Sequence, residues 1–514
     1  MLRPTLSSSS SSSLSNAPST DTTHSNADSQ HLVLVGGGHG HVQVIKALRN
    51  RPSNLRVTLL DATDAASYSG MVPGCIADAY TPEQTLLRLR PLAEWAGIDF
   101  RQEKVVDVDF ERKLLYTDQP DSDALSFDVL SLDIGSTSRD WQDVPGAAEF
   151  TIPTRPIDQL VRRLDAALDG VRALSTTTHN NNTAPPKLVV VGGGAAGIEL
   201  SMAITTRWKH FTPNVDCTVL DAGSQLVPHE SPTARRKLQS ILRDKHITVR
   251  HDCHVDHVTA DAVVLTSGDR IPFTCCVWAT GAGAHTLART TLAQRGLEVD
   301  KYGWIRVHPT LQSTSHDFVF AAGDCNTIVG LPEDQPSPPK AGVYAVRSGP
   351  VLIENLMRYS YPADRASALV PYTPQDDFLK LLVCGDHQAM GFRFGLALYG
   401  SWVFRMKDQI DRNFMKLFDV AHLPTRDDTT GSDAAASPTR QYDDSDDDDD
   451  NESKKEKVRL SAMDAAALLR RTDDDVDFQV AQSVLRRMAA DDSYRRDVLA
   501  HAAEHETIES PVHG

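Results

Sequence analysis

The pattern of apolar positions is clearest at residues 188–200, where an apolar run ends at a cluster of glycines and then resumes with helical spacing. The first part is short and uninterrupted, which is typical of a buried parallel strand. Gly192, Gly194 and Gly197 follow it with the spacing GxGxxG. The first glycine makes a tight turn, the second lets the backbone approach a pyrophosphate, and the third lets the helix pack on the strand.

A second region near the start of the chain has the same pattern. Residues 31–35 are an apolar run, Gly36 and Gly38 follow, and apolar positions from Val42 onward have mostly helical spacing. His41 stands where the third glycine would be, so we expect helix and strand to pack slightly further apart. Two such units indicate two bound nucleotides, and the economical pair is FAD with a nicotinamide cofactor.

Each unit has a second strand that ends in an aspartate, Asp61 in the first and Asp221 in the second. A carboxylate at this position is placed to bind ribose hydroxyls, although a solvated turn residue is the alternative. Residues 222–225 contain no cation, and the next arginines, Arg235 and Arg236, lie on a later segment. A 2′-phosphate would therefore meet an uncompensated negative charge, which favours NADH over NADPH.

Four further stretches have small residues where a flat ring or a sugar could approach the backbone. Residues 68–75 form a loop of small and turn residues, and residues 127–136 are a strand that ends at a Gly-Ser turn. Residues 318–324 are a short buried strand whose final aspartate can accept a hydrogen bond from a sugar-alcohol hydroxyl. Residues 338–347 open a helix that continues to residue 356.

Lys340 lies near the predicted start of that helix, where a cation opposes the helix dipole. An anion nearby would make this position more tolerable, and a solvated surface lysine is the alternative. Further along, residues 378–418 show strand-like alternation that includes Trp402 and Phe404, followed by an amphipathic helix over residues 407–415. The aromatic stripe is typical of a core or a dimer contact.

Composition adds limits to this picture. The 514 residues carry a formal net charge of −17, of which residues 443–452 alone supply eight carboxylates, so nucleic acid and a broad anionic membrane are disfavoured as partners. The seven cysteines have no small-domain spacing, which fits a reducing compartment. No apolar run is long enough to span a membrane, and no metal site is predicted. We expect a cytoplasmic protein, with mitochondrial localisation as the alternative.

Eight motifs occur in a specific order along the chain: GGGHGH, YSGMVPG, DVLSLDIGS, VVVGGGAAGIEL, VWATGA, FVFAAGD, PKAGVYAVRSGP and KDQIDRNFM. In this order the chain resembles the pyridine nucleotide-disulfide oxidoreductase family over residues 31–418. Within that family it is most similar to the NADH-dehydrogenase-like flavoprotein domain found fused to selenide, water dikinase, and more distantly to type II NADH dehydrogenases.

The resemblance implies an α/β fold with two Rossmann-like dinucleotide-binding domains, the NAD domain being inserted into the FAD domain, plus a smaller C-terminal α+β region. The expected boundaries are a disordered serine-rich tail over 1–30, an FAD domain over 31–155 and 300–345, an NAD(P) domain over 156–299, an interface region over 346–420, an acidic disordered linker over 421–457, and a tail of two short helices over 458–514.

The resemblance also assigns cofactor-binding residues, while the catalytic residues stay unassigned. For FAD these are Gly36, Gly38 and His39 at the pyrophosphate, Asp61 at the adenosine ribose, Asp324 at the ribitol, and Pro73, Gly74, Lys340 and Ala341 at the flavin ring, with Gly135 in the same group. For NADH they are Gly192, Gly194 and Gly197 at the pyrophosphate, Asp221 at the ribose, Glu199 near the nicotinamide and Gly281 along its path.

Three departures from the family limit the function. Cys75 has no second cysteine five positions away, which disfavours a thiol–disulfide relay. Residues 340–347 lack the glutamines typical of the quinone-linked branch, and no selenide, water dikinase domain follows residue 418.

We therefore expect an FAD-dependent NAD(P)H oxidoreductase that passes electrons to an unidentified small-molecule acceptor. Two alternatives stay open: a quinone reductase docked weakly on a membrane surface through residues 391–404, and a redox-sensing flavoprotein with little turnover. A homodimer is a further expectation, with residues 346–420 as its interface region.

Overall fold

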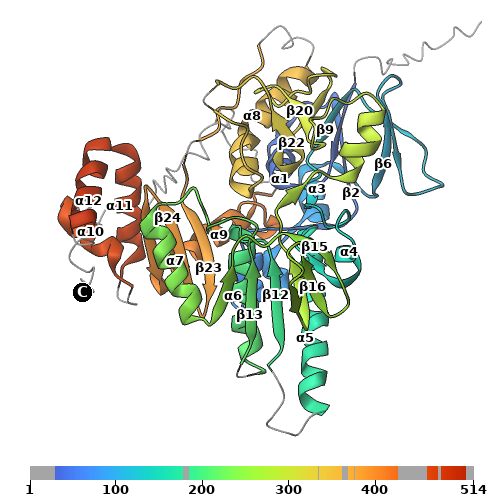
Figure 1. Cartoon of the computed structure of the whole chain (residues 1–514). Coiled ribbons are helices and arrows are strands. Elements are labelled where there is room, and N and C mark those ends of the chain that lie inside the picture. Colours follow the sequence, from blue (N-terminus) through green and yellow to red (C-terminus); the bar gives the residue numbers. More distant parts are fainter. Residues whose placement is uncertain are drawn as a thin grey trace, which may run out of the picture.

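The structure is a computed structural model that describes residues 29–177, 185–212, 214–333, 335–361, 368–375, 377–425, 460–472 and 476–504. The predicted disordered segments, 1–30 and 421–457, lie almost entirely outside the described residues. Two units built on parallel sheets lie one above the other, and a C-terminal layer lies along one side of the lower unit (Figure 1). The chain is therefore an α/β protein with two Rossmann-like units.

The first unit has a five-stranded parallel sheet in the order β21-β9-β1-β2-β5. Its strands are β1 (Gln30–Val35), β2 (Leu55–Asp61), β5 (Asp99–Gln102), β9 (Val129–Leu132) and β21 (Val319–Ala321). Helices α1 (His39–Ala47), α3 (Leu89–Ala96) and α8 (Gly342–Ser360) cover it, and α1 packs against both of the others. A small antiparallel sheet, β6 (Val105–Asp109), β7 (Leu114–Thr117) and β8 (Leu125–Ser126), completes the unit.

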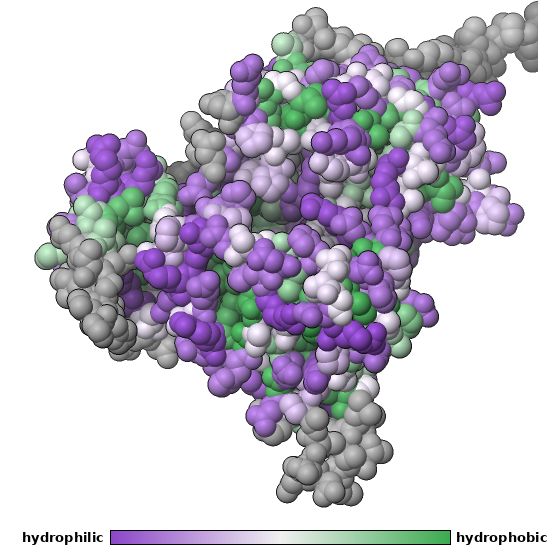
Figure 2. Space-filling model, in the orientation of Figure 1, coloured by the Kyte–Doolittle hydropathy of each residue, from purple (hydrophilic) through white to green (hydrophobic). Residues whose placement is uncertain are grey.

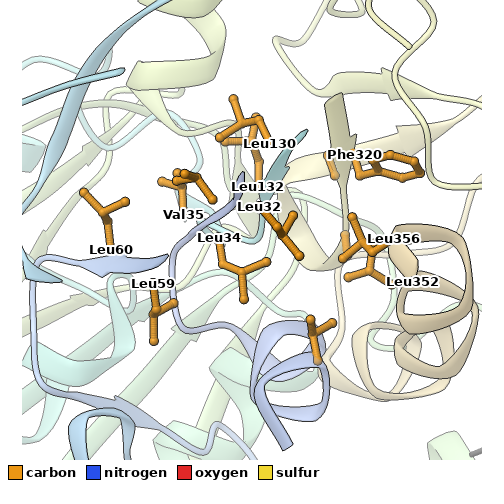
Figure 3. Close-up of a cluster of buried hydrophobic side chains, with 14 of the residues drawn as sticks. Leu32, Leu34, Val35, Leu59, Leu60, Leu130, Leu132, Phe320, Leu352 and Leu356 are labelled. Carbon is orange, nitrogen blue, oxygen red and sulfur yellow. The ribbon is translucent and has the colours of Figure 1, made fainter. Parts of the chain in front are cut away.

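The core of this unit lies between the sheet and the helices. Figure 3 shows Leu32 and Leu34 of β1 beside Leu352 and Leu356 of α8, with Phe320 close to them, all of them fully buried. Since α8 packs on α1 and on this core, it belongs to the first unit. The expected domain boundary at residue 345 falls inside this helix.

The second unit has its own five-stranded parallel sheet in the order β11-β18-β12-β13-β14. The strands are β11 (Ile152–Pro153), β12 (Lys187–Val191), β13 (Asp216–Leu220), β14 (Ile247–Arg250) and β18 (Cys275–Trp278), accompanied by α5 (Leu160–Thr177), α6 (Ala195–Lys209) and α7 (Pro232–Asp244). A second antiparallel sheet consists of β15 (Val255–Val258), β16 (Ala262–Leu265) and β17 (Arg270–Pro272).

The second unit is inserted into the first between β9 and β21. The chain leaves the first unit through β10 (Thr137–Ser138) and returns through β19 (Ala282–Gly283), and these two strands pair antiparallel. The two crossings therefore lie side by side, which fixes one unit relative to the other.

The third layer is an antiparallel sheet of β23 (Lys380–Gly385), β24 (Gln388–Arg393) and β25 (Leu396–Gly400), followed by α9 (Ser401–Lys416). The sequence pattern was misleading here, because Trp402 and Phe404 lie in the helix and not in a strand. Gly400, with φ of +133°, ends β25 directly before α9 and changes the direction of the chain. Both aromatic side chains are buried, as expected for core residues.

The described residues of the C-terminal tail form three helices, α10 (Ala462–Arg470), α11 (Phe478–Ala490) and α12 (Asp492–Glu504), where the sequence pattern predicted two. They share one apolar cluster with α9, and the fully buried Trp402 donates its indole N–H to the carbonyl of Arg471 at 2.8 Å. Within the described part of the chain, no helix combines the length and apolarity that a bilayer crossing needs, and no group of side chains suits a metal ion.

Candidate nucleotide and electron-transfer site

The glycines of the second unit surround the start of α6. Gly192 adopts φ of +122°, and a Cβ there would lie 2.2 Å from the carbonyl oxygen of Ala279. A Cβ on Gly197 would lie 2.0 Å from the carbonyl oxygen of Gly192. By contrast, no atom lies within 4 Å of the Cβ position of Gly194, which caps the helix. The N-terminus of α6 is therefore open at Gly194, as the approach of a phosphate group to the backbone would require.

In the first unit, His41 fills the place of the third glycine. Its Nδ1 donates to the carbonyl of Gly36 at 2.6 Å, and its Nε2 accepts from the hydroxyl of Ser131 at 2.8 Å. Burial lowers the pKa of His41 to about 4, so the ring is neutral at pH 7. The imidazole thus links α1 to the glycine turn and to β9 through hydrogen bonds that a glycine could not make.

Asp133 is the residue at this turn that the sequence pattern did not single out. Its Oδ2 accepts from the backbone N–H groups of Gly40 at 2.9 Å and His41 at 3.1 Å, and a Cβ on Gly38 would lie 2.2 Å from its Oδ1. Burial raises the pKa of Asp133 to about 7, because it outweighs the two hydrogen bonds, and Asp324 adds to the rise. The signal was an aspartate directly after the buried strand β9.

The two predicted ribose carboxylates are held differently. Asp61 accepts from the N–H of Gly37 at 2.7 Å and from the N–H of Thr63 at 2.8 Å, both of which are neutral donors. Asp221 accepts from the N–H of Gly223 at 3.2 Å, and its other oxygen is 3.0 Å from Nδ1 of His251. His251 comes from the segment after β14, 30 residues further along the chain, so no local pattern indicates it.

Asp324 forms an ion pair with Arg155 that the sequence did not reveal. Its Oδ2 is 2.5 Å from Nη1 of Arg155 and accepts from the hydroxyl of Ser136 at 3.1 Å. Gly135, with φ of +64°, has no atom within 4 Å of its Cβ position. His39 lies close enough to Asp324 for this carboxylate to raise the pKa of the imidazole, which burial lowers. The Nε2 of His39 is buried without a hydrogen-bond partner among the described residues. A buried nitrogen of this kind calls for a ligand or ordered water.

Lys340 and Ala341 directly precede α8, with Ala341 as the N-cap residue, so Lys340 lies near the start of the helix as expected. The Lys340 ammonium hydrogen-bonds to the carbonyl of Asn326 and lies 4.6 Å from the ring centroid of Trp304. Burial lowers the pKa of Lys340. A small, partly open pocket next to it is lined by residues that include Gly323, Asp324, Lys340, Ala341 and Tyr344.

Glu199, Gly70 and α9 meet where the three layers join. Glu199 Oε1 accepts from the N–H of Val383 at 2.7 Å, and burial raises its pKa to about 7, a rise that the positive charge of Lys407 partly offsets. Lys407, whose side chain is 5% exposed, donates to the carbonyl of Gly70 at 2.5 Å and pairs with Asp411 at 2.6 Å. Neither Lys407 nor Asp411 was among the predicted site residues.

The remaining predicted site residues are Pro73, Gly74 and Gly281. Pro73 and Gly74 are buried in the short helix α2 (Val72–Ile76), where a Cβ on Gly74 would lie 2.5 Å from the ring of Tyr80. Gly281 has φ of +104°, and its Cβ position is 3.8 Å from the guanidinium of Arg139. The predicted residues thus form one group around α1, one around α6, and a junction that includes Glu199.

Comparison with known proteins places this geometry in context. The family model described as pyridine nucleotide-disulphide oxidoreductase matches residues 30–349. The chain is 22% identical over 311 residues to the NADH dehydrogenase-like protein YutJ of Bacillus subtilis, covering 59% of this chain and 79% of that one. It is also 22% identical over 333 residues to the type II NADH:quinone oxidoreductase of Haemophilus influenzae, covering 58% and 74%.

Two solved structures share the fold. NDH2 of Plasmodium falciparum in complex with NADH superposes with a TM-score of 0.62 at 13% identity, covering 77% of this chain and 99% of that one. The sulfide:quinone oxidoreductase of Aquifex aeolicus superposes with a TM-score of 0.59 at 16% identity, covering 76% and 91%.

Proposed function

Because the chain belongs to the pyridine nucleotide-disulphide oxidoreductase family and is therefore an FAD-dependent NADH oxidoreductase, we propose that it passes the electrons of NADH to a small quinone-class acceptor without a cysteine relay. The similar proteins named NADH:quinone oxidoreductases support this acceptor class. The reaction balances as NADH, a proton and a quinone giving NAD⁺ and a quinol. The resemblance to a domain fused to selenide, water dikinase stays an expectation.

The first unit fits FAD. The start of α1 at Gly36, Gly38 and His39 would hold the pyrophosphate, and the unpartnered Nε2 of His39 supports this. Asp61 would bind the ribose and Asp324 the ribitol. The flavin ring would lie near the remaining predicted residues, Pro73, Gly74, Gly135, Lys340 and Ala341. FAD, when bound, supplies the two-electron chemistry between NADH and acceptor.

The second unit fits NADH. The open space at Gly194 supports binding of the pyrophosphate at the start of α6, between Gly192 and Gly197. Asp221 would accept hydrogen bonds from the adenosine ribose, and the path along Gly281 would lead the nicotinamide toward Glu199. With NADH and FAD bound in this way, electrons would pass to the junction of the three layers.

The observation that carries the proposal is the buried group of Glu199, Lys407 and Asp411 at that junction. A quinone needs protons as well as electrons, and a carboxyl with a pKa of about 7 can hold or release a proton near neutral pH. Lys407 is fixed by Gly70 and Asp411, so its positive charge stays close to Glu199. We assign to Glu199 the role of moving a proton to the acceptor; burial raises its pKa, Lys407 lowers it and Asp411 adds a smaller rise.

The cysteines support a mechanism without a thiol relay. All seven cysteines are free and buried, and burial raises the pKa of Cys75 to about 11, so its thiol is a poor nucleophile at pH 7. We expect Cys75→Ser to keep most of the wild-type rate of NADH oxidation in a steady-state assay. A rate below about 1% of wild type, a loss of roughly 2.7 kcal/mol, would bring a cysteine-based step back.

The segment suggested for membrane docking is covered by the chain itself. Phe392 is buried in the apolar cluster of the second unit, and Trp402 and Val403 are buried in the cluster that contains the tail helices. Figure 2 shows that the drawn face of the molecule mixes hydrophilic residues with apolar patches. Docking through residues 391–404 is therefore not part of the proposal, and we favour a water-soluble quinone.

An acceptor panel under anaerobic conditions tests the function. The purified yellow protein is mixed with NADH and with a short-chain naphthoquinone, a long-chain quinone in lipid vesicles, or a small disulfide. We expect the short-chain quinone to be reduced fastest and the disulfide not to be reduced. Tight binding of NAD⁺ without turnover on any acceptor would instead indicate a sensing flavoprotein, and a preference for the vesicle-bound quinone would restore the membrane alternative.

A further inference from the structure

The two nucleotide units differ at one position next to the ribose carboxylate. In the first unit, Asp61 pairs in register with Gln102 of the neighbouring strand, whose side chain is exposed. In the second unit, Leu220 pairs with Arg250, so the corresponding neighbours are Asp221 and His251. His251 Nδ1 is 3.0 Å from Asp221 Oδ2, and the two side chains are 28% and 13% exposed.

The Asp221 carboxyl group is confined on three sides. His251 holds Oδ2, and the N–H of Gly223 donates to Oδ1 at 3.2 Å. A Cβ on Gly193 would lie 2.4 Å from Asp221 Cγ, so the glycine turn closes a third side. Each carboxylate oxygen has two lone pairs, so one on each oxygen stays available for a ribose hydroxyl.

Nearby arginines are bound to other groups. Arg235 donates to the carbonyls of Pro228 and Glu230, Arg236 donates to the hydroxyl of Thr233, and Arg250 pairs with Asp269 at 2.7 Å. None of these contacts leads to Asp221. The side chain that donates a hydrogen bond to this carboxylate is thus His251, which directly follows β14. The sequence suggested no partner there.

We propose that His251 is a second determinant of nucleotide choice, which fixes the Asp221 carboxylate in the orientation that accepts the adenosine ribose of NADH and repels a 2′-phosphate. His251 acts through Asp221 and is therefore a positioning residue. Without its imidazole, Oδ2 of Asp221 loses its donor and the carboxylate can rotate away from the ribose. This inference rests on the proposed binding of NADH by the second unit.

Calorimetry that measures how tightly NAD⁺ and NADP⁺ bind to the purified holoenzyme tests the proposal without turnover. We expect wild type to bind NAD⁺ at least about tenfold more tightly than NADP⁺. His251→Ala should weaken NAD⁺ binding about five- to tenfold and leave NADP⁺ nearly unchanged, so the preference falls to about twofold. His251→Asn, which keeps a hydrogen-bond donor, should restore most of the preference.

Two further variants separate positioning from a general structural effect. In an Asp221→Ala background, His251→Ala should cause no further change in the preference, because the residue it positions is gone. His254→Ala, at an exposed histidine three residues away, is the matched control and should behave as wild type.

The proposal is wrong if His251→Ala keeps the wild-type preference, or if it weakens binding of both nucleotides equally. Failure of the proposed binding of NADH by the second unit looks different, since wild type would then bind neither nucleotide. The kcat/KM ratio for NADH over NADPH, measured on the same variants, should follow the binding ratio while kcat with NADH changes little.

Discussion

Asp133 and Asp324 illustrate how neighbouring carboxyl groups at one glycine turn acquire different properties. A Cβ on Gly323 would lie 2.4 Å from Asp133 Oδ1, so the turn before Asp324 passes directly over Asp133. Asp324 has Arg155 as its counter-charge, whereas Asp133 accepts from backbone N–H groups at the start of α1. Burial favours the protonated form of Asp133.

For Asp324, we expect replacement by alanine to weaken FAD retention about 10- to 100-fold, because a charge-assisted hydrogen bond contributes roughly 1.5–3 kcal/mol. The measurement is the ratio of flavin to protein absorbance after extended dialysis. Asp143→Ala is the control, because Asp143 forms an exposed pair with Arg289 at 3.8 Å. If both variants retain FAD equally, Asp324 does not contact the cofactor.

For Asp133, the pKa of about 7 predicts how stability depends on pH. Folding favours the protonated carboxyl, so its contribution is full below the ordinary pKa of about 4 and is lost as pH rises through about 7. Asp133→Asn removes this term. The free energy of unfolding of FAD-depleted wild type should therefore fall between pH 5 and pH 8 relative to the variant, as measured by urea denaturation. Parallel pH profiles would contradict the prediction.

At the scale of elements, α9 and the tail helices show where periodicity misleads. Residues 396–406 alternate like a strand across Gly400, yet the residues from Ser401 onward are helical. Trp402, Val403 and Phe404 are all buried, so this part of α9 is covered on more than one side and its helical spacing is hidden. In the tail, Asp491 accepts from the N–H groups of Ser493 at 3.0 Å and Tyr494 at 3.0 Å, so it caps a third helix directly after α11. This capping signal is present in the sequence and accounts for the missed helix.

Gly400 offers a test of how the tail is attached. A Cβ there would lie 2.6 Å from the carbonyl oxygen of Thr472, at a φ of +133°. We expect Gly400→Ala to lower stability by about 2–3 kcal/mol and to speed proteolysis of the tail, because strain and contact act together. Gly268→Ala is the control, since Gly268 has φ of +91° but no atom within 4 Å of its Cβ position. An equal loss in both variants would mean that backbone strain alone is responsible.

At the scale of the whole molecule, the junction of the three layers depends on one buried ion pair. Lys407 on α9 reaches Gly70 of the first unit and lies near Glu199 of the second, so all three layers share its charge. Because the Lys407–Asp411 pair is buried, we expect it to fix the layers relative to one another more than it adds to the net free energy of unfolding.

Removal of Lys407 should have two separable effects. Lys407→Met leaves Asp411 buried without its partner and should destabilise the protein by about 3–5 kcal/mol, whereas the double variant Lys407→Met with Asp411→Leu should recover most of this in thermal melts. In the double variant, loss of the positive charge should still raise the pKa of Glu199. The pH at which kcat changes should therefore move to a higher value. An unchanged pH profile would remove Glu199 from the proton path.

The sequence alone determined the features whose physical cause is local. The GxGxxG turn, the aspartates at the ends of β2 and β13, and the small residues before Asp324 each depend on backbone conformation within a few neighbours, which residue type constrains directly. These features also carried the resemblance to the family. The two-unit fold was predictable for the same reason, since each unit repeats one local pattern.

Only the tertiary structure decided which side chains hold those residues in place. Arg155 reaches Asp324 from 169 residues away, His251 reaches Asp221 from 30, and Lys407 reaches Gly70 from 337. The direction of each long side chain depends on how separate elements pack, and the spacing of residues in the chain contains no record of that packing. The sequence therefore predicted where nucleotides bind, and the packing of the three layers decided which charges surround those positions.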